Sequence, residues 1–343
     1  MVRLRFAAMA TVAIDARDAR GPQLRGWGRY TLELVRALRR RAEVDLLELD
    51  VGGRGPELAW EQLMLPRILS RSDADLVHAP NCFLPLRRPC PGVLTVHDLA
   101  FEDHPEDFAR LTGWKYRTFT PRCARSAERV ICVSEHTRVD LCERYGVNPD
   151  RTRTIHSAPC LAKGDGVPPP GPYLLAVGDL RRKKNLVRLA RAFARLHREG
   201  LPHRLVLAGL DAGEGAAIRA AAGAAPVELA GYVDDYRLDA LMRGADLLVY
   251  PSLYEGFGLV IVEAMARGCP VAIARATALP EAAAGAAALF DPLDEEDMAA
   301  TIRGVLDDEA LRSNMVARGR ARASELSWDR TAELTTAVYR ELL

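Results

Sequence analysis

Residues 251–270, PSLYEGFGLVIVEAMARGCP, decide how the rest of the chain is interpreted. Turn residues follow the apolar run LLVY, and a glycine-rich turn precedes a second apolar run that ends at Gly268. This order predicts a strand, a glycine-rich loop, and a helix that ends at a glycine. The backbone N–H groups at the start of such a helix, approached closely through Gly256 and Gly258, favour an anion such as a phosphate.

Two carboxylates flank this turn. Glu255 precedes the predicted helix and Glu263 lies inside it, with seven residues between them. Carboxylates repel phosphate, so these two are not expected to bind it. They can instead accept hydrogen bonds from hydroxyl groups on either side of a phosphate, as in a nucleotide sugar. The alternative is a buried strand–helix turn with two solvated glutamates, and the spacing alone leaves both interpretations open.

The same stretch resembles the E-x7-E signature of the retaining glycosyltransferases of family 4, also called glycosyl transferases group 1. The matching residues are Glu255, Gly256, Phe257, Gly258, Glu263, Ala264, Gly268, Pro270 and Val271. The resemblance extends over nearly the whole chain. It implies an α/β protein with the GT-B fold, in which two Rossmann-like domains face each other across a cleft and a C-terminal helix crosses back to the N-domain.

Length and composition agree with a two-domain enzyme. The chain has 343 residues, of which 49% are hydrophobic and 27% charged, so it can bury full cores. The formal net charge of +1 offers no bulk attraction for nucleic acid. The seven cysteines form no C-x-x-C pair and no zinc-like cluster, which predicts reduced thiols and a cytoplasmic protein. We find no apolar run of about 18 residues, the length that spans a membrane.

The first half begins with a predicted strand at residues 11–17, a glycine loop, and a helix at residues 28–40. This layout suits a phosphate, but a plain tight turn explains a lone G-x-G as well. The loop RGWGRY resembles the family's glycine loop. The resemblance implies that Gly26 and Gly28 face the donor phosphate.

A buried-type strand at residues 92–96 is followed by His97 and Asp98. Ligands of parallel sheets bind outside the C-terminal ends of the strands, although a single histidine is more often a structural hydrogen-bonding group. The HDL sequence resembles the family motif whose histidine lies beside the donor sugar. The resemblance therefore implies a catalytic role for His97.

Residues 110–129 mix basic and aromatic side chains: Arg110, Lys115, Arg117, Arg122 and Arg125 with Trp114, Tyr116 and Phe119. Such a segment can dock on an anionic membrane surface. A helix whose charges surround a core stripe is the alternative. If the first alternative holds, the protein makes peripheral contact with the inner face of the membrane. If the second holds, the segment is an ordinary helix packed on the core.

The segment 164–171 is rich in proline and glycine and marks the predicted linker. We predict an N-terminal acceptor-binding domain at residues 1–163, completed by a C-terminal helix at about 328–343. A nucleotide-sugar-binding domain is predicted at residues 172–327.

After the first strand of the second half come Arg181, Arg182, Lys183 and Lys184, a cluster that suits a diphosphate. The KKN end resembles the family's RKN, which assigns diphosphate binding to Lys184. This chain has Asp179 where many relatives have arginine, so Arg181 or Arg182 is expected to supply the second cation.

The resemblance assigns the remaining roles. Glu263 would bind the ribose hydroxyls and Glu255 the hydroxyls of the donor sugar. The donor set is completed by Gly256, Phe257, Gly258 and Leu259, with Tyr232 and Val233 against the nucleobase. We see no D-x-D carboxylate pair of the kind that metal-dependent glycosyltransferases use, so we expect no metal and no cofactor, with Lys184 and the helix N-terminus stabilising the leaving diphosphate.

The predicted activity is transfer of a hexose from a nucleotide sugar to an acceptor hydroxyl, with retention. The short motifs IDAR, WEQ and HDL most resemble those of bacterial mannosyltransferases. GDP-mannose is therefore the first candidate donor, and a UDP- or dTDP-sugar is the next. The acceptor would be a glycan, a glycolipid or a natural product. The alternatives are another GT-B enzyme, such as a sugar-nucleotide epimerase, and a non-catalytic nucleotide-sugar-binding subunit.

Overall fold

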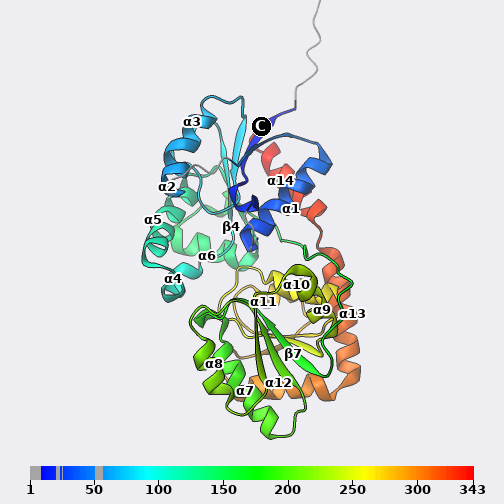
Figure 1. Cartoon of the computed structure of the whole chain (residues 1–343). Coiled ribbons are helices and arrows are strands. Elements are labelled where there is room, and N and C mark those ends of the chain that lie inside the picture. Colours follow the sequence, from blue (N-terminus) through cyan, green and yellow to red (C-terminus); the bar gives the residue numbers. More distant parts are fainter. Residues whose placement is uncertain (1–8, 21–23, 25, 51–56) are drawn as a thin grey trace, which may run out of the picture. The chain divides into compact units, whose positions relative to one another are not determined.

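The structure is a computed structural model that describes residues 9–20, 24, 26–50 and 57–343. The chain forms two compact units, which we call unit 1 (Met1–Ser157 with Ser327–Leu343) and unit 2 (Ala158–Leu326) (Figure 1). Each unit contains a six-stranded parallel sheet with helices packed on both faces. This arrangement confirms the predicted α/β class with two Rossmann-like domains.

Unit 1 has the strand order β2-β1-β3-β4-β5-β6. Its strands are β1 (Thr11–Asp15), β2 (Asp45–Leu49), β3 (Leu76–Ala79), β4 (Gly92–Val96), β5 (Arg129–Cys132) and β6 (Thr152–Thr154). Its α-helices are α1 (Gly26–Arg41), α2 (Glu57–Ala59), α3 (Leu65–Leu69), α4 (Ala100–Asp103), α5 (Arg110–Ser126), α6 (Glu135–Tyr145) and α14 (Trp328–Arg340). The shorter helical turns are η1 (Arg17–Arg20), the π-helical η2 (Trp60–Met64), η3 (Pro105–Asp107) and η4 (Pro149–Arg151).

Helices α1 and α14 cover one face of this sheet, and α2, α3 and α5 cover the other (Figure 1). Strands β3 and β4 are buried along their whole length, as expected for parallel strands with helices on both faces. The C-terminal helix α14 belongs to unit 1, which confirms the predicted return of the chain. Its Tyr339 hydroxyl lies 2.7 Å from Nδ1 of His78, a buried histidine on β3.

Unit 2 has the strand order β12-β11-β10-β7-β8-β9. Its strands are β7 (Tyr173–Val177), β8 (Arg204–Ala208), β9 (Val227–Gly231), β10 (Leu247–Tyr250), β11 (Val271–Ala274) and β12 (Ala288–Phe290). Its helices are η5 (Arg182–Lys184), α7 (Leu186–Arg198), α8 (Gly215–Ala222), α9 (Asp235–Gly244), α10 (Leu259–Ala266), α11 (Leu279–Ala283), α12 (Glu295–Asp307) and α13 (Glu309–Glu325).

Each sheet has a switch point, where successive strands stop being added on one side of the first strand and are added on its other side. In unit 1 this point lies between β1 and β3, and in unit 2 it lies between β7 and β10. The loops that leave two neighbouring strands there diverge to opposite faces, which opens a crevice outside their C-terminal ends. These two edges are where the fold places ligand-binding residues.

The segment that connects the units is tied to unit 2 at its start. The guanidinium of Arg267 donates to the carbonyl oxygen of Leu161, and the carboxylate of Asp239 accepts from the backbone N–H of Gly164. Arg243 donates to the carbonyl oxygens of Gly164 and Gly166. The division between the units therefore falls at Ser157 and Ala158, a few residues before the predicted linker at 164–171.

Candidate functional site

An ion pair lies at the switch point of the unit 2 sheet. Lys184 follows β7 and Glu255 follows β10, the two strands between which the chain reverses direction. Nζ of Lys184 lies 2.6 Å from Oε1 of Glu255 and 2.7 Å from the hydroxyl of Tyr250. The structure thus brings together two residues that are 71 positions apart in the sequence and were both predicted for the site.

Several donors hold the carboxylate of Glu255 in its charged form. The Ser252 hydroxyl donates to Oε1 of the carboxylate over 2.6 Å, as does the Lys184 ammonium. The backbone of Glu255 is held separately, because its N–H donates to Oγ1 of Thr277 over 3.0 Å. Burial by itself raises the pKa of Glu255, but the charges of Lys184 and Lys183 and the hydrogen bonds to the carboxylate lower it to about 2. Glu255 is therefore an anion throughout the neutral pH range and can accept hydrogen bonds from hydroxyl groups.

The glycine-rich turn lies between β10 and α10, in the predicted order of strand, loop and helix. Gly258 precedes α10 with φ 94° and ψ 49°, a left-handed conformation that favours glycine. A Cβ atom there would come within 2.9 Å of the side chains of Ile261 and Leu279. Gly256 and Phe257 are buried in the turn, and Leu259 is the first residue of α10. The turn therefore brings backbone close to the start of a helix, beside the Lys184–Glu255 pair.

Glu263 lies inside α10 and has a structural role that the sequence did not indicate. Its side chain is buried, and Oε1 accepts from the backbone N–H of Leu161 over 3.0 Å and of Cys160 over 3.3 Å. The residue predicted to bind the ribose hydroxyls therefore also holds the first residues of the connecting segment.

The other predicted donor residues of unit 2 follow β7 and β9. Arg181 lies 3.8 Å from Asp179, and Arg182 lies 3.6 Å from Glu214, so both guanidinium groups have carboxylate partners. Oδ1 of Asp179 accepts from the backbone N–H of Leu210. Tyr232 and Val233 follow β9, which β8 separates from β7, and the Tyr232 side chain is 48% exposed. Their contact with a nucleobase stays a prediction.

His97 lies at the C-terminal end of β4 in unit 1 and is buried. Nε2 lies 2.7 Å from the carbonyl oxygen of Pro80, which can only accept, so Nε2 carries the proton and Nδ1 is an acceptor. The ring stacks on Trp27 with centroids 5.6 Å apart and meets the edge of Tyr30 at 4.8 Å. Burial lowers the pKa of His97 to about 4, so the imidazole is neutral at pH 7.

The two predicted glycines lie at the start of α1 and differ in their surroundings. A Cβ atom on Gly28 would lie 2.3 Å from the carbonyl oxygen of Asp18, so glycine is required there for the packing of α1 against η1. A Cβ atom on Gly26 would meet nothing within 4 Å. Part of the preceding loop, residues 21–23 and 25, lies outside the described residues.

Two buried histidines predict how the stability of unit 1 depends on pH. Burial lowers the pKa of His78 to about 3 and that of His97 to about 4. In the unfolded chain both titrate near pH 6.5, so below that value the unfolded state binds more protons than the folded state. We expect stability to be fully present above about pH 6.5 and to fall by about 1.4 kcal/mol per pH unit for each histidine as the pH drops towards 4.

Urea unfolding of the chain between pH 7 and pH 5, followed with a probe in unit 1, measures this slope. The His78→Gln variant cannot take up this proton and should show a clearly smaller slope, whatever its stability at pH 7. An equal slope in the variant and the wild type would show that His78 does not contribute.

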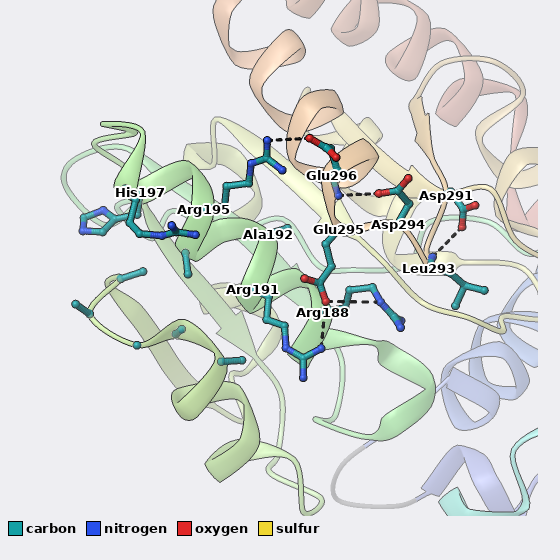
Figure 2. Close-up of a pocket in the computed structure, with 17 residues that line it drawn as sticks. Arg188, Arg191, Ala192, Arg195, His197, Asp291, Leu293, Asp294, Glu295 and Glu296 are labelled. Atoms are coloured by element: carbon teal, nitrogen blue, oxygen red, sulfur yellow. Dashed lines mark hydrogen bonds and ion pairs between the residues drawn. The ribbon is translucent and has the colours of Figure 1, made fainter.

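A pocket of about 920 Å³ lies elsewhere in unit 2, between α7, α8 and the start of α12 (Figure 2). None of the predicted site residues lines it. Its arginines face carboxylates: Arg191 lies 3.1 Å from Glu295, and Arg195 lies 2.9 Å from Glu296. The pocket is therefore lined by both cations and carboxylates, and it lies apart from the Lys184–Glu255 pair.

Sequence reasoning missed the residues that support the predicted ones. Tyr250, Ser252 and Thr277 contact Lys184 or Glu255, and Trp27 stacks on His97. Tyr250 and Ser252 both lie a few residues before Glu255 and the glycine-rich turn, so their positions in the sequence offered a signal. Thr277 lies 22 positions after Glu255, and only the folded chain shows that its hydroxyl reaches the turn.

Two features are absent from the residues that the structure describes. No group of three or more His, Cys, Asp or Glu side chains in this part of the chain is arranged to hold a metal ion. In the same residues, no helix combines the length and apolar character needed to cross a bilayer.

Comparisons with known proteins agree with this geometry. The family model described as glycosyl transferases group 1 matches residues 162–322, and the model described as glycosyltransferase family 4 matches residues 24–158. The O-antigen chain mannosyltransferase B of Escherichia coli is 29% identical, over 93% of this chain and 97% of that protein. The D-inositol 3-phosphate glycosyltransferase of Kineococcus radiotolerans is 30% identical, over 79% of this chain and 67% of that protein.

Solved structures share the fold. Anabaena HepE in complex with UDP-glucose superposes with a TM-score of 0.72 at 19% identity, covering 97% of this chain and 100% of that one. At this level of identity the likeness shows the architecture alone.

Proposed function

Because the chain belongs to the group 1 glycosyltransferases with the GT-B fold, we propose that it moves a hexose from a nucleotide sugar to an acceptor hydroxyl with retention of configuration. GDP-mannose is the first candidate donor, since the relative named above from Escherichia coli is a mannosyltransferase. A UDP- or dTDP-sugar is the next. The acceptor would be a glycan, a glycolipid or a natural product.

The observation that carries the proposal is the Lys184–Glu255 pair at the switch point of unit 2, beside the turn that opens α10. A diphosphate there would meet the Lys184 ammonium and the N-terminal N–H groups of α10. The Glu255 carboxylate, kept charged by its neighbours, would accept from donor-sugar hydroxyls. In the proposed roles Glu263 binds the ribose, and Arg181 or Arg182 supplies a second cation to the diphosphate.

In the proposed reaction, the bond between the anomeric carbon and the diphosphate oxygen breaks, and its electron pair stays on the diphosphate. The acceptor oxygen forms the new bond on the same face of the sugar, and its proton passes to the leaving phosphate. Lys184 stabilises the charge that grows on the diphosphate. His97 is neutral and presents Nδ1 as an acceptor, which suits a hydroxyl of the donor sugar.

A thermal-shift screen with GDP-, UDP-, dTDP- and ADP-sugars tests the donor. A ligand at 100 times its Kd stabilises the folded state by about 2.7 kcal/mol, so the correct donor should raise the Tm most. We expect GDP-mannose to give the largest shift. A larger shift with a UDP- or dTDP-sugar would reassign the donor, and no shift with any nucleotide sugar would contradict the function.

Turnover assays separate the alternatives. A transferase forms a glycoside of the added acceptor together with the nucleoside diphosphate. A non-hydrolysing sugar-nucleotide epimerase interconverts two nucleotide sugars, needs no acceptor and forms no glycoside. Release of any nucleoside diphosphate excludes a non-catalytic binding subunit.

We expect turnover to continue in excess EDTA. The positive charges of Lys184 and of the α10 N-terminus are placed to offset charge on the diphosphate, which is the work a metal ion does in other enzymes. Initial rates with and without EDTA measure this. A loss of turnover in EDTA that Mg²⁺ or Mn²⁺ restores would show that a metal takes part.

The same proposal includes peripheral contact with anionic membranes through α5. Leu111 and Trp114 on this helix are 83% and 52% exposed, and Arg110, Arg117 and Arg122 are exposed with them. Lys115 and Tyr116, which the sequence placed in the same basic and aromatic set, are buried and cannot contribute. The membrane-facing set is therefore smaller than the sequence predicted.

We expect the protein to sediment with vesicles that contain phosphatidylglycerol, and the double variant Leu111→Ser/Trp114→Ser to do so much less. The exposed pair Val139→Ser and Leu311→Ser is the matched control, since neither residue lies on α5. Equal sedimentation of the α5 variant and the wild type would contradict the contact.

A further inference from the structure

A tryptophan on α1 lies against the face of the His97 ring. The indole of Trp27 stacks on the imidazole with ring centroids 5.6 Å apart and an interplanar angle of 19°. Tyr30, three residues further along α1, meets the same imidazole at 87° with centroids 4.8 Å apart. Two residues of one helix therefore contact this ring, one over its face and one at right angles to it.

These aromatic contacts fix an orientation that a hydrogen bond alone leaves open. Nε2 of His97 donates to the carbonyl oxygen of Pro80 over 2.7 Å, which sets the tautomer and leaves Nδ1 as the acceptor. A single hydrogen bond still allows the ring to tilt, because the angular preference at a carbonyl oxygen is broad. A stacked indole and a perpendicular phenol ring restrict that tilt. The direction of the Nδ1 lone pair is therefore set by α1 together with Pro80.

Trp27 is itself held in place. Its indole lies 5.6 Å from the ring of Tyr116 on α5 and packs against the buried core of unit 1. The next residue, Gly28, brings the backbone of α1 so close to η1 that a Cβ atom would lie 2.3 Å from the carbonyl oxygen of Asp18. Trp27 is half-buried, whereas His97 is only 8% exposed. The indole thus covers a face of the imidazole from a fixed position.

Tyr30 is covered by the C-terminal helix. It is 2% exposed, and the ring of Trp328 on α14 meets it at 69° with centroids 5.6 Å apart. This side of the His97 ring therefore lies deep in unit 1. The half-buried indole is the part of the cover that a single substitution can open to water.

We infer that Trp27 is a positioning residue for His97: its indole keeps water from one face of the imidazole and holds the Nδ1 lone pair in one direction, so that His97 stays a neutral acceptor when the medium becomes acidic. The inference rests on the proposed transferase function, in which this acceptor binds a hydroxyl of the donor sugar. Trp27 acts through His97 and needs no contact with the substrate.

The polar groups around His97 favour its protonation once the cover is removed. In the described part of unit 1, the titratable groups that face the ring are Asp98, His78, Cys82 and Tyr30. Burial lowers the pKa of His97 to about 4, whereas the Pro80 carbonyl and the charge of Asp98 raise it. Less burial therefore moves this pKa up towards its ordinary value of about 6.5. Below its pKa both ring nitrogens donate, and the acceptor at Nδ1 is lost.

NMR titration of the histidine rings tests the position of Trp27 directly. In Trp27→Ala we expect the pKa of His97 to rise from about 4 towards about 6.5, and its ring protons to lose the upfield shift that a stacked indole produces. Trp27→Phe keeps an aromatic face over the imidazole and should stay near the wild type. Trp27→Leu fills part of the volume without a planar face and should give a smaller rise, so it tests the inference even if the alanine variant does not fold.

His78 is the internal control in the same samples. It lies on the neighbouring strand β3 and hydrogen-bonds to Tyr339, so it should keep its low pKa of about 3 in all three variants. A change confined to His97 separates a local effect of the indole from a general loosening of unit 1.

Initial rates between pH 7.5 and pH 5 give the functional readout. With a pKa near 6.5, only about one His97 ring in 30 is neutral at pH 5, so kcat/KM for the donor should fall up to about 30-fold in Trp27→Ala over this range. Protonation of His97 should cost the wild type and Trp27→Phe less than about twofold. Circular dichroism at each pH checks that each protein is folded.

The outcomes separate this inference from the proposed function. An unchanged pKa of His97 in the alanine and leucine variants, or an equal rise at His78, would overturn the inference, because the indole would then give His97 no specific cover. A raised pKa of His97 with an unchanged pH profile would overturn it as well, since the acceptor at Nδ1 would not matter for transfer. No turnover of any donor by the wild type would contradict the proposed function, while the NMR titration would still show whether Trp27 covers His97.

Discussion

Replacing Lys184 with alanine is expected to lower kcat about 100-fold or more, with a smaller loss of donor affinity. Charge on the diphosphate grows as the glycosidic bond breaks, so the ammonium group interacts more strongly with the transition state than with the bound donor. The same change removes the partner that lies 2.6 Å from Glu255. Steady-state kinetics with the donor and an excess of acceptor measure both effects.

The pH profile gives a second readout of this variant. With Lys184 present, the pKa of Glu255 is lowered to about 2. Without it, the burial that raises this pKa is opposed by fewer charges, so the carboxylate should take up a proton at a higher pH. We therefore expect the residual activity of Lys184→Ala to decline as the pH becomes acidic. Over the same pH range Glu255 stays charged in the wild type, so its protonation should not lower the wild-type activity.

Two control variants separate the roles of the ammonium group. Lys183→Ala removes the neighbouring charge without removing the Lys184–Glu255 contact and should cost much less activity. Tyr250→Phe removes only the hydroxyl that lies 2.7 Å from Nζ and should have a small effect. If Lys184→Ala raises KM and leaves kcat unchanged, the lysine binds the donor without stabilising the transition state, and the proposed role is wrong.

The parts of the site that could be predicted are those whose structure depends on neighbouring residues in the sequence. The turn Gly256–Gly258 lies between an apolar strand and an apolar helix, and Gly258 takes the left-handed backbone for which glycine is suited. Lys184 and Glu255 lie in the loops that follow β7 and β10, so the rule that ligands bind at the C-terminal ends of parallel strands places both at one edge. The two sheets follow from the alternation of strands and helices, whereas the return of α14 was expected only from the resemblance to the family.

The parts that could not be predicted depend on which distant groups meet. Lys115 looks like a surface charge in the sequence, but in the fold it is buried between two glutamates and lies over the ring of Phe83. Gly28 resembles a phosphate-binding glycine, but its missing Cβ is required by the Asp18 carbonyl. The periodicity of a helix shows which face is buried, and it does not show which polar group from another element lies there.

Glu263 has two roles: it accepts hydrogen bonds from the connecting segment, and it is proposed to bind the ribose of the donor. Its replacement is therefore expected to have two separate effects. In Glu263→Ala, the N–H groups of Cys160 and Leu161 lose the acceptor they have in the folded state. Leaving such groups unsatisfied costs about 1–3 kcal/mol, so unit 2 should lose stability by that amount. Loss of the proposed ribose contact should also weaken donor binding about 10- to 100-fold.

Glu263→Gln separates these effects, because its amide oxygen can still accept from Leu161 while the negative charge is lost. We expect the glutamine variant to keep most of the stability and the slow hydrogen exchange of the Leu161 amide, and to bind the donor more weakly than the wild type. In the alanine variant the exchange at Leu161 should be faster as well. Urea unfolding, hydrogen exchange at Leu161 and calorimetric titration with the donor measure the three quantities. Unchanged donor affinity in both variants would remove Glu263 from the nucleotide site and leave it with the connecting segment alone. Unchanged exchange at Leu161 in the alanine variant would show that the connecting segment is held without this carboxylate.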